Sequence, residues 1–355
     1  MWRRFRERYD ITDVILRLIG FSILAFAVIG SIATLQSGKY TPRQWLDFVV
    51  SGVTQGSVYA LIALGYTLVY GILRMINFAH GEVFMCGAFA GYFVVTGLNQ
   101  SGFLDQNWLL GLVIVAVSAM LTSMIVAVLL ERIAYRPLRR APRLVPLITA
   151  IGASFFLQYT VRGLFGSQFR SYPEIPQLEG SVSLLGGVLV IQYVQLLVIV
   201  AAALFMLGLY QLVQQTRTGK AMRAVSEDKD VAALMGIDVD AIIVRTFVIG
   251  AALAGAAGVL YALLFRQVTF LMGFVPGIKA FTAAVLGGIG NIPGAMLGGL
   301  FLGVVESVGP TLFLDGLGVP APNQLKDAIA FVMLVMVLIF RPTGILGERL
   351  ARTKA

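Results

Sequence analysis

The sequence has 355 residues, of which 58% are hydrophobic and 13% are charged, with a net charge of +9 and a mean hydropathy of +0.86. A soluble domain carries about 25% charged residues, so this composition excludes an ordinary soluble protein and predicts a surface that mostly faces lipid. The single histidine, His80, and the single cysteine, Cys86, exclude an intramolecular disulfide and a usual zinc site.

Apolar runs of spanning length occupy most of the chain, since a helix that crosses a bilayer needs about 20 mostly apolar residues. The predicted spans are 14–35, 46–70, 78–97, 109–130, 146–165, 188–213, 242–265 and 325–340. The first run follows an Arg-rich start, as a signal peptide does, but it exceeds the usual apolar core of about 7–15 residues. We therefore predict that it is retained as an extra span.

Lys and Arg gather in alternate connecting segments, which predicts the orientation. They are frequent in 131–145, in 214–240 and at both termini, and absent from 98–108 and 310–324. We therefore predict that both termini and the two basic loops are cytoplasmic. The basic residues lie between apolar runs and not on one helix face, so we exclude nucleic acid as a partner and expect membrane lipid instead.

The apolar stretch 278–309 is interrupted by glycines and by Pro293. It is too long for one span and too short for two, and with both termini inside it must start and end outside. We therefore predict a hairpin of two half-helices, which is tolerated at membrane depth only inside protein or beside a wet cavity. The predicted fold is all-α, a polytopic membrane helix bundle with about 8–9 spans plus this broken-helix hairpin.

Two segments resemble each other, each with an Asn, a Gly a few residues later and then small residues at helical spacing. They begin at Asn77 and at Asn291, and either Asn can cap the start of a helix. Matched interruptions in two halves point to an internal inverted repeat and a transport pathway, although a chance match of Gly-rich helices is the alternative. The predicted pathway or gate residues are Asn77, His80, Gly81, Glu82, Asn291 and Gly294.

His80 and Glu82 are ionisable groups within an apolar segment, and such groups are often functional. A gate, a helix-end hydrogen bond and a substrate contact all fit these two residues. The structural alternative is that Glu82 caps a helix beginning near residue 78 and that His80 is a satisfied interior donor.

Residues 214–240 form the most informative polar stretch. Apolar positions between Ala221 and Met235 predict two short amphipathic helices joined by a charged turn at 226–230 and ended by Gly236. Ser226, followed by two acidic residues, is the predicted N-cap of the second helix. The residues alone leave two interpretations open, a helix that fits a groove on a soluble partner and a helix that lies on lipid headgroups.

Several strings resemble the permease subunits of branched-chain amino acid ABC importers, of the LivH-like type. The resemblance runs from about residue 45 to 345 and rests on Gly52 to Gly71, Ile76-Asn-Phe-Ala-His-Gly-Glu82, Arg217-Thr-Gly-Lys-Ala-Met-Arg-Ala224, Ala232-Ala-Leu-Met-Gly-Ile237 and Gly287-Gly-Ile-Gly-Asn-Ile-Pro-Gly294. It divides the chain into an N-terminal basic segment with an extra span (1–44), a permease transmembrane domain (45–345) and a cytoplasmic tail (346–355).

The resemblance implies that residues 227–236 are a version of the cytoplasmic loop that docks on the ATPase, although the usual Glu-Ala-Ala is split here. The coupling residues carried over are Arg223, Glu227, Asp228, Ala232, Ala233 and Gly236. The implied partners are a second homologous permease subunit, two cytoplasmic ABC ATPase subunits and a periplasmic substrate-binding protein, around a multi-pass subunit in the inner (plasma) membrane. No cofactor is implied for this chain, with ATP on the partner subunits.

The sequence lacks a P-loop string, so this chain is not expected to bind ATP in that way or to act as an enzyme. Carriage of branched-chain or other neutral amino acids is the predicted function, and a urea or short-amide permease is the alternative within importers. An ion-coupled transporter or channel is the alternative outside them. It would need several ionisable residues within spans, and those present are His80, Glu82, Glu306 and, near helix ends, Arg74, Arg162 and Arg245.

Overall fold

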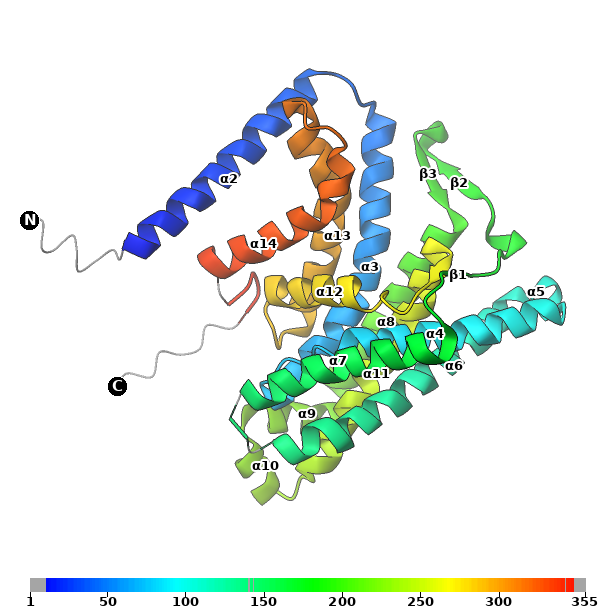
Figure 1. Ribbon diagram of the computed structural model, residues 1–355, viewed down its shortest axis with the longest axis vertical. Coiled ribbons are helices and arrows are strands. Elements are labelled where there is room, and N and C mark those ends of the chain that lie inside the picture. The colour runs from blue at the N-terminus through cyan, green and yellow to red at the C-terminus, as the bar shows by residue number, and fades with distance from the viewer. Residues whose placement is uncertain (1–10, 140, 143, 342, 348–355) are drawn as a thin grey trace, which may run out of the picture.

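The structure is a computed structural model that describes residues 11–139, 141–142, 144–341 and 343–347 (Figure 1). The basic start 1–10 and residues 348–355, both predicted to be cytoplasmic, lie outside the described residues. The longer helices are α2 (Ile11–Gln36), α3 (Pro42–Leu73), α4 (His80–Gln100), α6 (Trp108–Leu130), α7 (Leu144–Phe165), α8 (Tyr193–Gln215), α9 (Arg217–Glu227), α11 (Val239–Phe265), α12 (Phe274–Gly287), α13 (Ile292–Leu314) and α14 (Lys326–Phe340).

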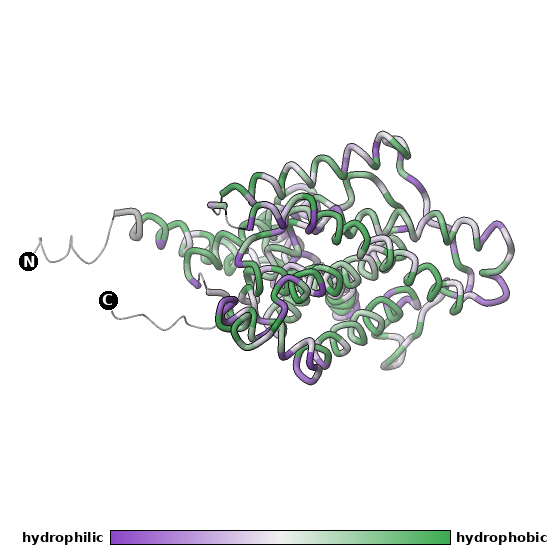
Figure 2. Tube along the Cα trace, turned by 90° about the horizontal axis from the view of Figure 1, so that it is seen from below, coloured by the Kyte–Doolittle hydropathy of each residue, from purple (hydrophilic) through white to green (hydrophobic). Residues whose placement is uncertain are grey.

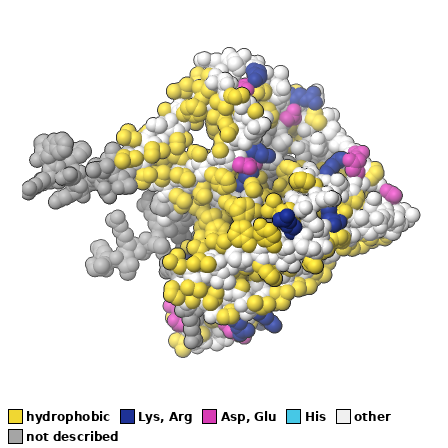
Figure 3. All heavy atoms as spheres, in the orientation of Figure 1, with side chains coloured by type: hydrophobic (Ala, Val, Ile, Leu, Met, Phe, Trp, Pro, Cys, Tyr) yellow, Lys and Arg dark blue, Asp and Glu magenta, His cyan; other side chains and the backbone are white. Residues whose placement is uncertain are grey.

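The predicted all-α membrane bundle is confirmed. Within the described residues, nine helices are long and apolar enough to cross a membrane. Figure 2 shows hydrophobic residues along the helices and hydrophilic residues gathered mainly where they connect. On the face in Figure 3, hydrophobic side chains cover much of the surface and charged side chains stand in small separate groups. Such an apolar exterior suits lipid or a partner subunit.

The predicted span 188–213 is wrong at its start, because α8 begins only at Tyr193. The preceding residues form β3 (Leu189–Gln192), which pairs antiparallel with β2 (Ser181–Leu184). The run is continuously apolar and follows Gly186-Gly187, and periodicity in a short apolar run does not separate strand from helix.

The predicted hairpin of two half-helices is half correct. At 1.5 Å per residue, α12 is about 21 Å long, whereas α13 is about 34 Å long and exceeds the hydrocarbon thickness of about 30 Å. Gly288 and Gly290 adopt positive φ angles of 106° and 97° in the tight connection between them, a backbone that only glycine adopts readily. The glycines therefore mark a turn, after which a complete span begins.

The chain after α14 returns to the end of α12. The Ile345 N–H donates to the Leu286 carbonyl at 2.8 Å, and the Leu346 N–H donates to the Gly287 carbonyl at 3.1 Å. These bonds put the end of α12 and the segment after the last span at the same end of the bundle. The segment that contains α12 and α13 therefore starts and ends on the same side of the bundle, as the sequence predicted for residues 278–309.

Helices α3 and α13 pack closely at the centre of the bundle. A Cβ atom added to Gly303 would stand 2.3 Å from the Gly56 Cα atom, so the two backbones are in direct contact. Small residues permit this approach where apolar side chains gain nothing by leaving lipid. In the most apolar window of each helix, 83% of the α3 residues are buried but only 6% of those of α14. The core therefore lies around α3, and α14 is peripheral.

Helix α2 lies against the far end of α13. The Thr34 hydroxyl accepts a hydrogen bond from the Gly316 N–H at 2.8 Å and donates to the Thr311 carbonyl at 3.4 Å. Beyond it, Lys39 forms a 2.9 Å ion pair with Asp315, and this pairing raises the pKa of the Lys39 ammonium group. The predicted extra span thus forms a helix with specific contacts to the bundle, and its retention in the mature protein stays a prediction.

Candidate functional site

Two short helices, α9 and α10 (Lys229–Leu234), form an elbow between α8 and α11, which we call the α9–α10 elbow. The Thr216 hydroxyl caps α9 by accepting from the Gly219 N–H at 3.1 Å. Asp228 caps α10 by accepting from the N–H groups of Asp230 and Val231 at 2.9 and 3.0 Å. The predicted pair of short helices is therefore correct.

The predicted cap of the second helix is wrong. Helix α9 continues through Glu227, so Ser226 is helical and its hydroxyl donates to the Arg223 carbonyl at 2.7 Å. Asp228 has the extended backbone and acceptor geometry of an N-cap in its place. Gly236 lies just beyond α10 with a φ of 83°, as predicted for a helix stop.

The elbow buries one face and exposes another. Met222, Val225 and Ala232 are buried, whereas Val231, Leu234 and Met235 have exposed fractions of 54%, 87% and 78%. These three exposed apolar side chains on one short segment form a knob that is costly in water. The sequence pattern placed these three residues on the apolar face, yet the predicted coupling set omitted them.

The predicted coupling residues divide into three groups. Glu227, Asp228, Ala233 and Gly236 are exposed around the knob, whereas Ala232 is buried beneath it. Arg223 is exposed, but its guanidinium donates to the Gln214 side chain at 3.0 Å and to the Gln214 carbonyl at 3.3 Å. Arg223 thus braces the corner between α8 and α9.

The elbow is tied to the end of α3 through Arg74. This residue adopts a left-handed backbone with a φ of 56°, its N–H donates to the Tyr70 carbonyl at 2.8 Å, and its guanidinium donates to the Ser226 carbonyl at 3.2 Å. Partial burial, with the charges of Arg139 and Arg74, lowers the pKa of the neighbouring Lys229. Basic side chains from separate elements therefore converge on the inner side of the elbow.

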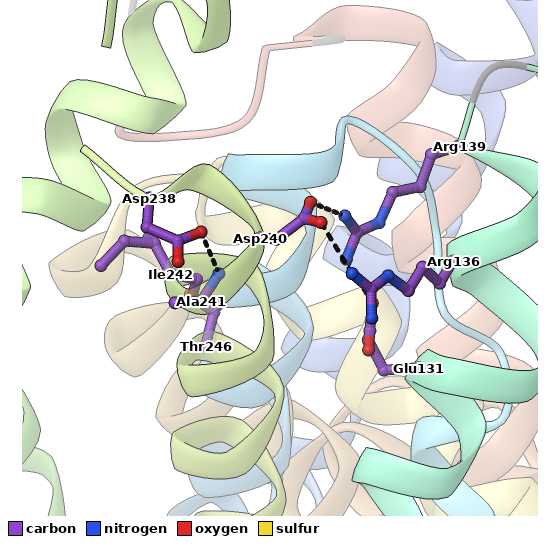
Figure 4. A network of polar contacts seen from close by, with 8 residues as sticks. All are labelled: Glu131, Arg136, Arg139, Asp238, Asp240, Ala241, Ile242 and Thr246. Atoms are coloured by element: carbon purple, nitrogen blue, oxygen red, sulfur yellow. Dashed lines mark hydrogen bonds and ion pairs between the residues drawn. The ribbon is translucent and has the colours of Figure 1, made fainter. Parts of the chain in front are cut away.

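A second polar network joins the end of α6 to the start of α11 (Figure 4). Arg139 forms ion pairs with Glu131 and Asp240, and Arg136 pairs with Asp240 at 2.9 Å. Glu131 is fully buried, at the π-helical turn Glu131–Tyr135. The arginines that served to predict orientation thus also fix the helix on which the elbow is mounted.

The start of α4 brings four predicted pathway residues together in the core. Asn77 was predicted to cap the helix, but it does not. Its side-chain oxygen accepts from the Tyr135 hydroxyl at 2.6 Å, and α4 begins at His80. The His80 Nε2 atom is buried without a hydrogen-bond partner among the described residues, so the alternative of a satisfied interior donor gains no support from this nitrogen. It packs against Gly65, where an added Cβ atom would stand 2.0 Å from it.

Glu82 connects α4 to α7 and does not cap its own helix. Its Oε1 atom accepts from the Gln158 amide at 2.6 Å and from the Ser154 hydroxyl at 3.2 Å. Gly81, beside it, lies against Gly273, and an added Cβ atom would be 2.4 Å from the Gly273 carbonyl oxygen. Helices α4, α7 and α12 therefore meet at this point.

The other two predicted pathway residues lie elsewhere. Asn291 caps α13, as predicted, by accepting from the Gly294 N–H at 2.9 Å, and its amide donates to the Leu346 carbonyl at 2.8 Å. Gly294 packs against Gly287, at the opposite end of α12 from the contact with Gly81. At 1.5 Å per residue the two groups are separated by about 20 Å, and the internal repeat stays a prediction.

Sequence reasoning also missed a buried cation. The Lys279 ammonium, on α12, donates to Glu306 at 2.7 Å and to Asp327 at 2.6 Å, and its side chain is 4% exposed. A lysine inside the apolar run of α12 was the signal available. In the described part of the chain, no group of three or more His, Cys, Asp and Glu residues could hold a metal ion.

Comparison with known proteins gives a consistent result. A family model described as "Branched-chain amino acid transport system / permease component" matches residues 48–338. The BraD "high-affinity branched-chain amino acid transport system permease protein" of Pseudomonas aeruginosa is 49% identical over 308 residues, covering 86% of this chain and 96% of that protein. The LivH proteins of Salmonella typhimurium and Escherichia coli K12, described in the same words, are 43% and 42% identical, each covering 86% of this chain and 96% of its own length.

Proposed function

This chain belongs to the branched-chain amino acid transport permease family, and on that premise we propose that it carries branched-chain amino acids inward through the inner membrane, with the α9–α10 elbow docked on an ATPase subunit. A second homologous permease, two ATPase subunits and a periplasmic binding protein complete the proposed importer. The names of the relatives support the substrate class. Both termini and the elbow are assigned to the cytoplasm by their basic charge.

The observation that carries the docking proposal is the knob of Val231, Leu234 and Met235. Exposed apolar side chains on a rigid, doubly capped elbow fit a hydrophobic groove on a soluble partner. The surrounding charges of Glu227 and Asp228 then supply a polar rim, as at other interfaces. A lipid-facing elbow is less favoured, because Glu227 and Asp228, which are exposed beside the knob, would then face anionic headgroups.

The docking proposal is tested by Leu234→Asp and Met235→Asp, measured by co-purification of the ATPase and by ATP-driven leucine uptake. Each aspartate puts a charge into the buried centre of the interface, so we expect uptake to fall at least about tenfold. Leu184→Asp is the matched control, since Leu184 is an exposed leucine on the β2–β3 hairpin. Retained ATPase binding and full uptake in the two knob variants would exclude the elbow as the docking element.

Orientation and substrate are tested separately. In a Cys86→Ala background, an impermeant thiol reagent added outside intact cells is expected to label Leu184→Cys but not Leu234→Cys, because the hairpin and the elbow lie at opposite ends of the molecule (Figure 1). Uptake of urea or a short amide in place of leucine would support the alternative permease. Labelling of Leu234→Cys from outside would reverse the proposed topology.

A further inference from the structure

A recess opens at the end of the molecule opposite the α9–α10 elbow. It lies between the β2–β3 hairpin and the ends of α8 and α11, and it encloses about 350 Å³. A smaller hollow of about 20 Å³ shares four of its lining residues, Leu178, Val194, Leu263 and Arg266. We call the two spaces together the Arg266 recess. Small-molecule sites commonly enclose about 300–1,000 Å³, so its size suits a small ligand.

Arg266 stands where the two spaces meet, on a backbone held in place. It ends α11 in a left-handed conformation with a φ of 54°, and its carbonyl accepts from the Tyr172 N–H at 2.9 Å. The next residues form β4 (Gln267–Val268), which pairs with β1 (Arg170–Ser171). The fold therefore fixes the position from which the guanidinium projects.

The ion pairs that Arg266 forms are exposed enough for a ligand carboxylate to replace one of its partners. Its guanidinium pairs with Glu174 and lies 3.7 Å from a Glu179 oxygen, and all three side chains are about half exposed, at 51%, 64% and 48%. Ion pairs that are this exposed contribute little to stability. An incoming carboxylate can thus replace Glu174 on the arginine fork, which matches carboxylates in bidentate geometry.

The remaining walls of the recess supply apolar surface. Leu178 and Leu263 are buried, with exposed fractions of 6% and 7%. Tyr172 lines the smaller hollow, is 2% exposed, and its buried hydroxyl has no hydrogen-bond partner among the described residues. The hydroxyl is closed off from solvent and lies beside α4, where a Cβ atom added to Gly91 would stand 3.2 Å from it, so the proposed site does not use it.

We propose that the Arg266 recess binds the zwitterion of an amino acid with an apolar side chain. The ligand carboxylate lies on Arg266, its ammonium on Glu179, and its side chain against Leu178 and Leu263. The site rests on the proposed function and deepens it, since the recess faces the side from which an importer receives substrate. It acts as a first, weak site on the permease itself. Urea carries neither charge and gains none of these pairs.

The test measures equilibrium binding of radiolabelled leucine to the full chain in phosphatidylglycerol nanodiscs, without binding protein or ATPase. We expect saturable binding that valine displaces and urea does not. Arg266→Gln is expected to weaken it at least about tenfold, the loss of a charge-assisted pair. Lys39→Gln is the matched control, because Lys39 also forms an exposed ion pair, with Asp315.

The two glutamates give the sharper comparison and do not depend on the folding of the Arg266 variant. Glu179→Gln should weaken leucine binding, whereas Glu174→Gln should leave it equal or tighter, because Glu174 competes for the guanidinium. If the cluster is only structural, the two variants will behave alike, and this result overturns the proposal. Absence of saturable leucine binding in the unaltered protein overturns it as well.

A zwitterionic phospholipid headgroup has related chemistry and is distinguished in a second arm. Native mass spectrometry compares phosphatidylethanolamine retained by the unaltered protein and by Arg266→Gln. Specific retention that Arg266→Gln removes, without leucine binding, assigns the recess to lipid and overturns the proposal. If Arg266→Gln takes up leucine normally while Leu234→Asp does not, amino acid binding in the Arg266 recess is refuted and the proposed function stands.

Discussion

The α9–α10 elbow and the start of α4 differ in the kind of group that each leaves without a partner. The elbow exposes apolar side chains, such as Leu234 and Met235, on a frame whose caps are satisfied. The start of α4 buries polar groups, and two of them, His80 Nε2 and Glu82 Oε2, have no partner in the described part of the chain. On a loop between spans, exposed apolar surface favours a protein partner, whereas buried polar groups without a partner are explained by a water, a ligand or a second conformation. The elbow is thus the candidate surface for a partner, and the start of α4 is a closely packed region with polar groups left for a water or a ligand.

The largest expected effect tests how tightly the start of α4 is packed. In Gly81→Val, the new Cβ atom would stand 2.4 Å from the Gly273 carbonyl oxygen, which belongs to backbone and cannot turn aside. Overpacking of this kind costs about 1–3 kcal/mol or more, so we expect a large drop in the yield and melting temperature of the detergent-solubilised protein. Gly71→Val is the control, because nothing lies within 4 Å of its added Cβ atom. Equal stability of the two variants would contradict the close α4–α12 contact.

Most of the fold was predictable because lipid makes long apolar runs unmistakable, and Arg and Lys reveal the loops. The wrong predictions concern places where the same local sequence pattern is compatible with more than one structure. Asn77 and Asn291 are each followed by a glycine within four residues, yet only Asn291 caps a helix, because the Tyr135 hydroxyl from a distant element donates to Asn77 at 2.6 Å. The pairing of Lys279 with Glu306 and Asp327 likewise joins three helices, and no single segment contains it. Tertiary contacts of this kind are not encoded in any one stretch.

The site was predictable in position but not in its contact residues. The charged pattern of 214–240 located the elbow, and the resemblance indicated a partner. Leu234 and Met235 of the knob were left out of the predicted contact residues. The split Glu-Ala-Ala motif beside them indicated Glu227 and Ala233 as the contacts. Which apolar residues of an amphipathic helix remain exposed depends on how the helix is mounted, and Arg223 and Arg74 determine this through bonds to other elements.

An intermediate effect is expected for Arg74→Ala, which breaks a contact between the α9–α10 elbow and the segment that leads to the start of α4. Arg74 touches Ser226 on α9 and precedes His80 by six residues, so it joins the elbow to the start of α4. Loss of its partly exposed hydrogen bond costs about 1 kcal/mol, or about fivefold in an equilibrium. We expect uptake per ATP hydrolysed to fall by about this factor, while ATPase binding remains.

Arg74→Gly refines that experiment. Glycine also loses the contact but adopts the left-handed backbone without strain. We expect the same loss of coupling, measured as leucine taken up per ATP hydrolysed, with higher thermal stability than Arg74→Ala. Full coupling in both variants would show that the elbow and the start of α4 communicate by another route.

The smallest expected effect concerns the frame of the elbow. Asp228→Ala removes the side-chain acceptor of the Asp230 and Val231 N–H groups, and loss of an N-cap costs about 1 kcal/mol. Amide hydrogen exchange in α10 should then become about fivefold faster, with a modest loss of ATPase binding because the knob is less rigidly presented. Ser226→Ala is the matched control, since Ser226 lies within α9 and caps nothing, and its exchange should be unchanged. If the two variants exchange alike, α10 is held by its buried Ala232 and not by its cap, and the elbow owes its rigidity to packing, as the start of α4 does.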